Sequence, residues 1–392
     1  MMLLRRCLSM TKRDAKDEKK APKLRFKGFT DDWEQVPLEN IIKVNSGRDY
    51  KFANPGDIPV YGTGGYMLSI DTKLSDEDAV GIGRKGTINK PFFLKAPFWT
   101  VDTLFYLTSR NQNNIHFLLP LFQKINWKRY DESTGVPSLS KSTINKIRVN
   151  IPKIEEQRNV ALLFQSLDHT ITLHEEKRKQ LEQLKKALLQ KMFADKTNFP
   201  EIRFNGYVSP WEQVKLGEIF TECTEKSRDG NEPLLSVTIN DGVVKSESLD
   251  RKSNASKDKS NYKIVRPNNI AYNSMRMWQG AVGVSNYYGI VSPAYTVISL
   301  NETTNSPFFY QYYFKKSSSL NTFRKNSQGL TPDTWNLKYP LFKLIKYRIP
   351  QYDEQKKIGQ LFQKLDYTIN LHDQKIEDLK QLKQALLQQM FI

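Results

Sequence analysis

A stretch of 39 residues occurs twice in this chain, and it restricts the possible folds more than any other feature. The first copy runs from Glu155 to Phe193 and the second from Asp353 to Phe391, without a gap between the two alignments. An Ile-Pro pair precedes each copy, Ile151-Pro152 and Ile349-Pro350. Proline disfavours helix in the residue before it and is tolerated in a first helical turn. We therefore expect one long helix to begin just beyond each pair.

Apolar residues recur with a heptad spacing in both copies, which is typical of a coiled-coil seam. They are Leu167, Ile171, Leu181, Leu188 and Met192 in the first copy, and Leu365, Ile369, Ile376, Leu379, Leu386 and Met390 in the second. A helix of about forty residues reaches roughly 60 Å. Such a length suits a spacer better than the wall of a pocket.

His174 and His372 fall on this seam at equivalent places in the two copies. Polar residues in a helical interface can fix its register, and we favour that interpretation for this pair. A metal-binding or catalytic role is the alternative.

The segment before each helix also has a repeated opening, at Pro22 to Ile41 and at Pro200 to Ile219. Both copies keep an Arg-Phe pair, a glycine and the run Trp-Glu-Gln-Val. The chain is therefore a tandem duplication of one unit: an opening, a variable domain and a long helix. The two variable domains differ almost completely in sequence, so one repeated scaffold carries two different domains.

The first variable domain, about residues 39–150, has β-branched and aromatic runs broken by glycines, which predicts short strands joined by turns. We expect strands within residues 58–67, 79–88 and 100–108 and a helix from Ile115 to Lys124. The second variable domain, about residues 220–347, carries Asp241-Gly242 between apolar alternations, which predicts a tight hairpin. An aromatic-rich helix is expected near Pro307 to Lys316. Both domains are predicted to be mixed α and β.

Basic residues exceed acidic ones, with 60 Lys and Arg against 42 Asp and Glu, and the net charge is +18. Such a balance favours a polyanionic partner, either nucleic acid or an anionic membrane surface. The membrane is the weaker choice, because no apolar run approaches the roughly 20 residues of a spanning helix.

The two cysteines, Cys7 and Cys223, are too few for a disulfide framework or a thiolate metal site. A reducing cytoplasm is the expected location. Residues 1–21 are expected to form a disordered basic lead without an export signal, and Met10 is as plausible a start as Met1.

Gly81, Gly83 and Gly86 match the spacing of a dinucleotide-binding loop, but that loop requires a following helix. Pro91 and Pro97 follow instead, so we expect a tight basic loop that contacts phosphates or base edges, or a plain solvated turn. Near matches to the adenine-methyltransferase signature occur at Asn89 and Asn305, but each lacks the first proline. A methyltransferase active without partners is therefore a minor alternative.

Several polar, basic and aromatic side chains of the variable domains have the chemistry of DNA contacts, since they can pair with base edges or phosphates or pack against sugars. The candidates are Arg48, Lys51, Tyr61, Thr63, Arg84, Lys85 and Thr87 in the first domain, and Asn240, Tyr272, Asn273, Arg276 and Gln279 in the second. For Tyr272 and the nearby Trp278 we favour a position in the core over a DNA contact. No catalytic set is recognisable, and no residues have metal-ligand spacing.

Taken together, the duplicated Arg-Phe opening, the Glu-Gln after Ile-Pro, the Leu-Asp-x-Thr-Ile run and the Met-Phe ending resemble the specificity subunit of type I restriction-modification systems. The resemblance covers about residues 22–392. It implies an α+β fold of two mixed α/β target-recognition domains, related by a pseudo-two-fold axis. Two long helices, packed as an antiparallel coiled coil, would separate these domains.

The same resemblance implies that each recognition domain reads one half of a split DNA site, and that the helices set the unread spacer. It also implies partners: double-stranded DNA, two methyltransferase subunits and restriction or translocase subunits. No cofactor is then expected on this chain, and S-adenosylmethionine, ATP and Mg²⁺ would be bound by the partners. Residues assigned by this pattern to subunit docking or helix pairing are Glu156, Gln157, Leu167, Asp168, Glu354, Gln355, Leu365 and Asp366, with His174 and His372 on the seam.

The expected division of the chain is a lead at 1–21, recognition domains at 22–150 and 199–348, and spacer helices at 151–198 and 349–392. A non-catalytic DNA reader within a larger complex is the leading hypothesis. A self-sufficient enzyme and a coiled-coil scaffold without DNA function are the alternatives.

Overall fold

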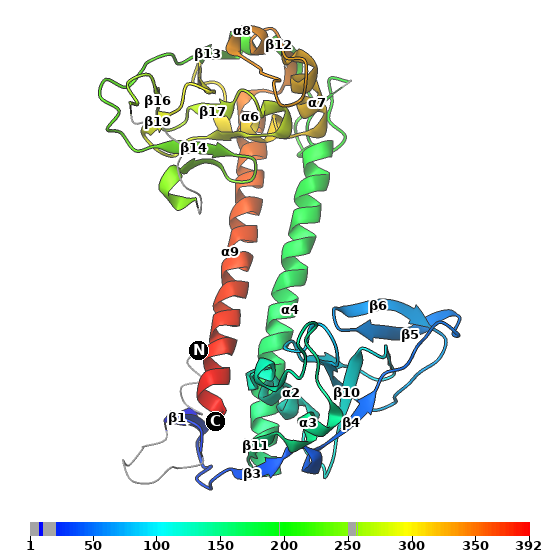
Figure 1. Ribbon diagram of the computed structural model, residues 1–392. Helices are drawn as coiled ribbons and strands as arrows, with labels where there is room; N and C mark the ends of the chain where they lie inside the picture. Colours follow the sequence, from blue (N-terminus) through cyan, green and yellow to red (C-terminus); the bar gives the residue numbers. More distant parts are fainter. Residues whose placement is uncertain (1–7, 11–20, 196, 250–255, 257) are drawn as a thin grey trace. The chain divides into compact units, whose positions relative to one another are not determined.

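The computed structural model describes residues 8–10, 21–195, 197–249, 256 and 258–392 (Figure 1). The chain forms two compact units. The first unit consists of the described residues of Met1–Glu175 together with Gln374–Ile392, and the second consists of those of Glu176–Asp373. Each unit thus combines one variable domain with a segment of both long helices.

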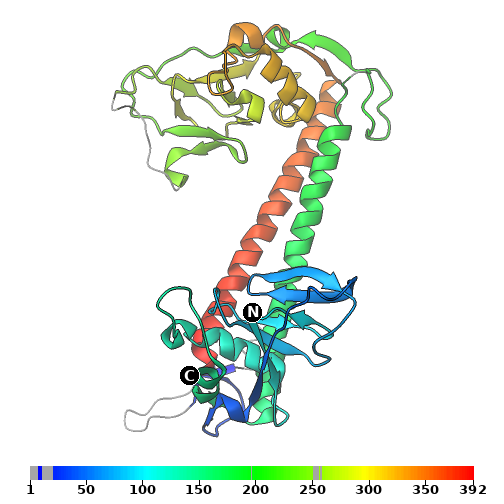
Figure 2. The same cartoon turned by 45° about the vertical axis from the view of Figure 1, so that its right-hand side comes forward.

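The first unit is built on a four-stranded antiparallel sheet with the order β4-β10-β7-β8. Its strands are β4 (Ile42–Ser46), β7 (Ala79–Gly83), β8 (Phe92–Leu94) and β10 (Leu104–Ser109). A second sheet contains β5 (Pro55–Gly62), β6 (Gly65–Ile70) and β9 (Trp99–Thr100). The β5–β6 hairpin forms one edge of this domain in both views (Figures 1 and 2). The other elements are β2 (Leu24–Phe26), β3 (Glu34–Pro37), η1 (Leu38–Asn40), α2 (Ile115–Lys124), η2 (Trp127–Tyr130), α3 (Lys141–Lys146) and β11 (Arg148–Ile151).

The second unit is built on a four-stranded antiparallel sheet with the order β13-β20-β17-β18. Its strands are β13 (Phe220–Glu222), β17 (Ile270–Asn273), β18 (Val282–Val284) and β20 (Tyr295–Leu300). Two further strand pairs are β14 (Leu235–Thr238) with β15 (Gly242–Lys245), and β16 (Lys263–Val265) with β19 (Gly289–Val291). The remaining elements are β12 (Glu212–Lys215), α5 (Leu216–Ile219), η3 (Ser246–Ser248), η4 (Met277–Gln279), α6 (Pro307–Tyr313), α7 (Ser317–Asn326), α8 (Tyr339–Phe342) and β21 (Lys346–Ile349).

The two variable domains share a core topology that their sequences do not reveal. In each four-stranded sheet, the first strand along the chain pairs with the last, and the last pairs with the second. Each domain is also closed by an antiparallel pair between the opening segment and the strand before the long helix, β3 with β11 and β12 with β21. The additional strands lie between the shared ones and differ between the domains, so the two readers differ in their insertions rather than in their core.

The long helices are α4 (Ile154–Lys191) and α9 (Tyr352–Met390), as the Ile-Pro pairs and the heptads predicted. Their segments lie side by side within each unit in both views (Figure 2). In the first unit Lys383 Nζ lies 2.6 Å from Asp168 Oδ1, and Lys380 Nζ lies 2.7 Å from Glu175 Oε1. The residue number of the α9 partner falls as the residue number along α4 rises, so the two segments run antiparallel.

The second unit repeats this pairing. Lys185 forms an ion pair with Asp366, and Arg178 Nη1 lies 3.3 Å from Asp373 Oδ1. Asp366 and Lys185 occupy the positions of Asp168 and Lys383 in the other sequence copy. Asp168 and Asp366 thus each join the two helix segments of their own unit by an ion pair.

A phenylalanine near the end of each sequence copy packs into an aromatic cluster of the unit it reaches. The Phe391 ring lies 5.5 Å from the Phe117 ring and 5.8 Å from the Phe164 ring, between centroids. In the second unit the Phe193 ring lies 5.3 Å from Phe309 and 5.8 Å from Phe362. Because aromatic rings bury a large apolar area, these clusters stabilise the end of each helix against a variable domain.

A buried ion pair joins each opening segment to the first turn of a long helix. Arg25 Nε and Nη2 donate to the Glu156 carboxylate at 2.6 and 2.8 Å, and the Trp33 indole donates to the same carboxylate at 3.2 Å. Arg203 makes the equivalent bidentate contact with Glu354 at 2.7 Å for both bonds. The carboxylates also lie at helix N-termini, where negative charge is favourable.

A glutamine follows each of these glutamates and joins the helix to its variable domain. Gln157 Nε2 donates to the Pro152 carbonyl at 3.0 Å and to Asn113 Oδ1 at 2.9 Å, and its Oε1 accepts from the Asn114 amide. Gln355 repeats all three contacts with Pro350, Asn305 and Ser306. Glu156, Gln157, Glu354 and Gln355 are all buried. Their polar atoms are occupied within the unit, at the start of each long helix, and their part in docking another subunit stays a prediction.

Most predicted elements of the variable domains are confirmed. The helix Ile115–Lys124 has the expected bounds, and the Asp241-Gly242 hairpin joins β14 to β15. The aromatic helix α6 is shorter than expected and ends at Tyr313. Part of the predicted disordered lead is wrong, because Leu8–Met10 forms strand β1, which pairs with β2. The rest of that prediction, for residues 1–7 and 11–20, lies outside the described residues.

The Arg203–Glu354 pair provides a test of this construction. Removing one partner of a buried ion pair leaves an uncompensated charge, so we expect Glu354→Ala to lower the free energy of unfolding by about 3–5 kcal/mol. Asp353→Ala removes an exposed carboxylate from the same helical turn and should cost less than about 1 kcal/mol. Urea denaturation of the two variants measures the difference. Equal destabilisation would contradict a specific role for the buried pair.

Candidate DNA-reading surfaces of the two variable domains

One short segment, Trp99–Thr103, brings together most of the candidate residues of the first variable domain. The Thr100 carbonyl accepts from the Arg48 amide at 2.9 Å, and the Trp99 indole donates to the Arg48 carbonyl at 2.9 Å. The Tyr61 carbonyl accepts from the Val101 amide at 3.0 Å. The Thr103 carbonyl accepts from the amides of Arg84 and Lys85 at 2.8 and 3.3 Å. Three stretches that are distant in sequence are therefore neighbours.

The Gly-rich motif forms the tight basic loop between β7 and β8. Gly83 approaches the Thr87 carbonyl so closely that an added Cβ would lie 2.2 Å from that oxygen, and Gly86 has a φ of +89°. Only glycine fits such positions without strain. The next element is strand β8, so the expectation that no helix follows this motif is confirmed. Arg84 and Lys85 are exposed on the loop, and Thr87 is half-buried.

The β5–β6 hairpin adds apolar side chains that the sequence did not single out. Tyr66 and Met67 are 63% and 49% exposed on β6, and Phe52 is 71% exposed with its ring 5.5 Å from Trp99. Thr63, in the turn of this hairpin, lies close to Gly86, since an added Cβ there would be 4.0 Å from Thr63 Oγ1. The sequence signal that could have identified this edge is the Tyr66-Met67 pair, which directly follows the glycine-rich turn.

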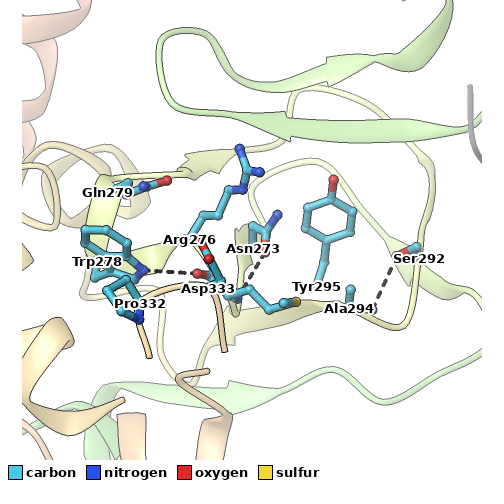
Figure 3. A pocket seen from close by; sticks show the side chains of 10 residues that line it. Asn273, Arg276, Trp278, Gln279, Ser292, Ala294, Tyr295, Pro332 and Asp333 are labelled. Carbon is cyan, nitrogen blue, oxygen red and sulfur yellow. Dashed lines mark hydrogen bonds between the residues drawn. The ribbon is translucent and has the colours of Figure 1, made fainter. Parts of the chain in front are cut away.

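In the second variable domain, three of the five candidates line one pocket of about 420 Å³ (Figure 3). They are Asn273 at the end of β17, and Arg276 and Gln279 at η4. Asn273 Oδ1 accepts from the Met275 amide at 3.0 Å, and the Trp278 indole donates to the Met275 carbonyl at 3.1 Å, so the segment is held from both sides. The sequence did not indicate the other polar lining residues, which are Ser292, Tyr295 and Asp333.

Tyr272 is not on this surface, and its prediction as a DNA contact is wrong. Strand β17 lies between β20 and β18, and the Tyr272 side chain is fully buried, with its ring stacked 5.3 Å from Phe342. Asn240 lies exposed in the β14–β15 turn and is not among the residues that line the pocket.

The two candidate surfaces are built from equivalent connections of the shared sheet. The loop β7–β8 contains Arg84, and the corresponding loop β17–β18 contains Arg276. The Leu139 amide donates to the Arg84 carbonyl at 3.0 Å, and the Leu337 amide donates to the Ser274 carbonyl at 2.8 Å. Basic residues therefore occupy the same connection in both domains, although the sequences of the loops differ.

Other assigned residues lie on the long helices. Leu167 and Leu365 are buried, and His174 and His372 are half-buried. The register-setting role of the two histidines stays a prediction. Among the described residues, no three His, Cys, Asp or Glu side chains are grouped as a metal site would require. None of the described helices is both long and apolar enough to cross a membrane.

Comparison with known proteins gives a consistent result. A family model described as "Type I restriction modification DNA specificity domain" matches residues 30–183 and again residues 208–381, which together make up most of the chain. The chain belongs to the type I restriction-modification DNA specificity family. The specificity subunit contains two of these domains in tandem, and its family is one of non-catalytic DNA-recognition components.

Two relatives are similar over nearly the whole chain. The specificity subunit of the type I restriction enzyme MjaVIII from Methanocaldococcus jannaschii is 20% identical, over an alignment that covers 91% of each protein. The crystal structure of the type I restriction-modification S subunit from M. genitalium superposes with a TM-score of 0.65 at 14% identity, over 95% of this chain and 99% of that one. The latter shows the similarity of fold.

The turn that carries Asn240 is held by an unusual lysine. Lys315 Nζ donates to the carbonyls of Ile239 and Asn240 at 3.0 and 3.4 Å. Burial, reinforced by the nearby Lys185 ammonium, lowers the pKa of Lys315 to about 8. Because the pKa of an unfolded lysine is about 10.4, the unfolded chain binds more protons than the folded chain between pH 8 and 10.

We therefore expect Lys315 to make the second unit more stable as the pH rises through this range, by at most about 3 kcal/mol. Lys315→Met keeps the apolar stem and cannot titrate. Urea denaturation at pH 7.5 and 9.5 should show the stability of the native protein rising relative to that of the variant. A difference that is independent of pH would contradict the lowered pKa.

Proposed function

We propose that each variable domain of this specificity subunit reads one half of a bipartite, asymmetric DNA site, and that α4 and α9 set the length of the unread spacer between the halves. In this proposal the chain carries out no chemistry. It selects the sequence on which the other subunits of the restriction-modification complex act.

The observation that carries the proposal is the identical attachment of two unlike domains. The Arg25–Glu156 and Arg203–Glu354 pairs have the same bidentate geometry, and Gln157 and Gln355 make the same three contacts. Beyond these attachments, the variable domains differ in the sequences of their loops and in their inserted strands. Because the attachment is the same and the loops differ, we expect the two domains to approach DNA in equivalent ways and to recognise different bases.

The charge of the chain also supports DNA as the partner. A net charge of +18 favours a polyanion, and Arg48, Lys51, Arg84 and Lys85 are all exposed on the first variable domain. Contacts with phosphates would supply much of the affinity without selecting sequence, and the affinity would fall steeply with salt. The proposed DNA-reading residues are those of the Trp99–Thr103 neighbourhood and of the pocket around Arg276.

The long helices offer surfaces for partner subunits. In the first unit Leu162 and Leu173 are 64% and 50% exposed on α4, and their spacing of eleven residues places them on one face. In the second unit Tyr367 and Leu371 are 65% and 45% exposed on α9, one turn apart. These apolar pairs are proposed to dock one methyltransferase subunit each, to which restriction or translocase subunits are then added.

The partner subunits would supply the cofactors. Methyl transfer requires S-adenosylmethionine and the extrusion of the target base, and translocation requires ATP and Mg²⁺. These groups belong to the partners in this proposal, and the cytoplasm is the proposed location of the assembled complex.

Exchange of one variable domain tests the proposal. The assembled complex is prepared with residues 39–150 replaced by the variable domain of another specificity subunit, and the methylated sequences are read across a genome. We expect one half of the motif to change while the other half and the spacer are kept. The reciprocal exchange of residues 220–347 is the control and should change only the other half. If either exchange altered both halves, the assignment of one domain to each half would be wrong.

A further inference from the structure

We propose that the pocket of the second variable domain reads one G·C base pair, with Arg276 donating to guanine and Asp333 accepting from the amino group of the paired cytosine. The inference rests on the proposed function and adds the chemical identity of one recognised base pair. It concerns the pocket lined by β17, η4, the turn before β20 and the segment at Pro332-Asp333.

The backbone that carries Arg276 is held in place by several hydrogen bonds. Its amide donates to the Asn273 carbonyl at 2.9 Å, and its carbonyl accepts from the amides of Gln279 and Ala281 at 3.0 and 3.2 Å. Gly280 ends the turn in the left-handed conformation, with a φ of +91°. Figure 3 shows the Arg276 guanidinium extending past Asn273 toward the same side as the Tyr295 ring. Because the backbone is already fixed, binding has to order only the side chain of Arg276.

The charges of the residues that line the pocket fit a base pair better than a phosphate. Among the described residues that line the pocket, Arg276 is the one cation, and Asp333 is an anion. A phosphate would be repelled by the Asp333 carboxylate, so the pocket is a poor site for the DNA backbone. Guanine presents two acceptors, O6 and N7, to a guanidinium, and cytosine presents an amino group to a carboxylate. Adenine also has an amino group and one acceptor, N7, but only guanine offers the guanidinium two adjacent acceptors, so a pair of G with C fits both side chains best.

The pocket lies at the connection of the shared sheet that carries the basic loop in the first domain. The segment of Arg276 occupies the connection that carries Arg84 and Lys85 in the first variable domain, and both segments are pinned by a leucine amide at equivalent sequence positions, Leu139 and Leu337. In the first domain Arg84 Nη1 donates to the Asp102 carbonyl at 3.4 Å and its guanidinium lies 5.9 Å from the Phe105 ring. Arg276 instead lines an open pocket beside the Asn273 and Gln279 amides, so the G·C assignment applies to the second domain.

The test uses the complex assembled with its methyltransferase subunits and a DNA library in which the half-site of the second domain is randomised. Methylated products are sequenced for the wild type, Arg276→Ala, Arg276→Lys and Asp333→Ala. Arg228→Ala, which removes an exposed arginine of the same domain outside the pocket, is the control. We expect the wild type to require a G·C pair at one position. Arg276→Ala should lose about 5- to 150-fold of that discrimination there and none elsewhere.

Asp333→Ala should weaken discrimination at the same position, Arg276→Lys should keep part of it, and Arg228→Ala should leave the motif unchanged. An equal loss at every position in Arg276→Ala would identify a phosphate contact and overturn the inference, as would an unchanged motif. If Arg276→Ala failed to assemble, the Asp333→Ala result would decide. A wild-type complex without a bipartite motif would refute the proposed function itself, whereas a bipartite motif that is insensitive to Arg276 and Asp333 would refute only the base assignment.

Discussion

The buried bidentate pair between an arginine of the opening segment and a glutamate of the first helical turn is the contact on which each unit depends. It joins residues 131 positions apart in the first unit and 151 apart in the second, so it closes each variable domain onto the start of its long helix. A buried charge is tolerated only with a well-placed partner, and this requirement fixes where the helix begins relative to the domain. The adjacent glutamine then fixes the variable domain against the same turn.

Because this attachment is the same in both units, the loops above it are free to differ. The four-stranded sheets have one topology, whereas the inserted strands, the exposed hairpin of the first domain and the Arg276 pocket of the second are particular to each. A specificity subunit requires this separation, since recognition has to change without loss of assembly. The residues that stabilise the fold are therefore different from those that we propose to select bases.

The sequence predicts the features that depend on neighbouring residues or on the repeat. These are the long helices, their apolar seam, the hairpin at Asp241-Gly242 and the duplicated openings. It does not predict the partners of Glu156 and Glu354, because the pairing arginines lie more than a hundred residues away. Tyr272 remained among the candidates for DNA contact for a related reason. Its strand is covered on both faces, so Ala271 and Tyr272 are both buried and no alternation of polar and apolar residues marks an exposed side. The shared four-stranded sheet could not be predicted either, because its strands have the same topology in the two domains but different sequences.

In the proposed function, one chain carries two independent domains that read the two halves of a single DNA site. The most direct measurement is the map of adenine methylation produced by the intact complex in cells that otherwise lack this modification. We expect one motif, made of two specified blocks of different sequence separated by a gap of fixed length in which any base is accepted. A single continuous block, or an assembled and active complex that methylates without sequence preference, would contradict it.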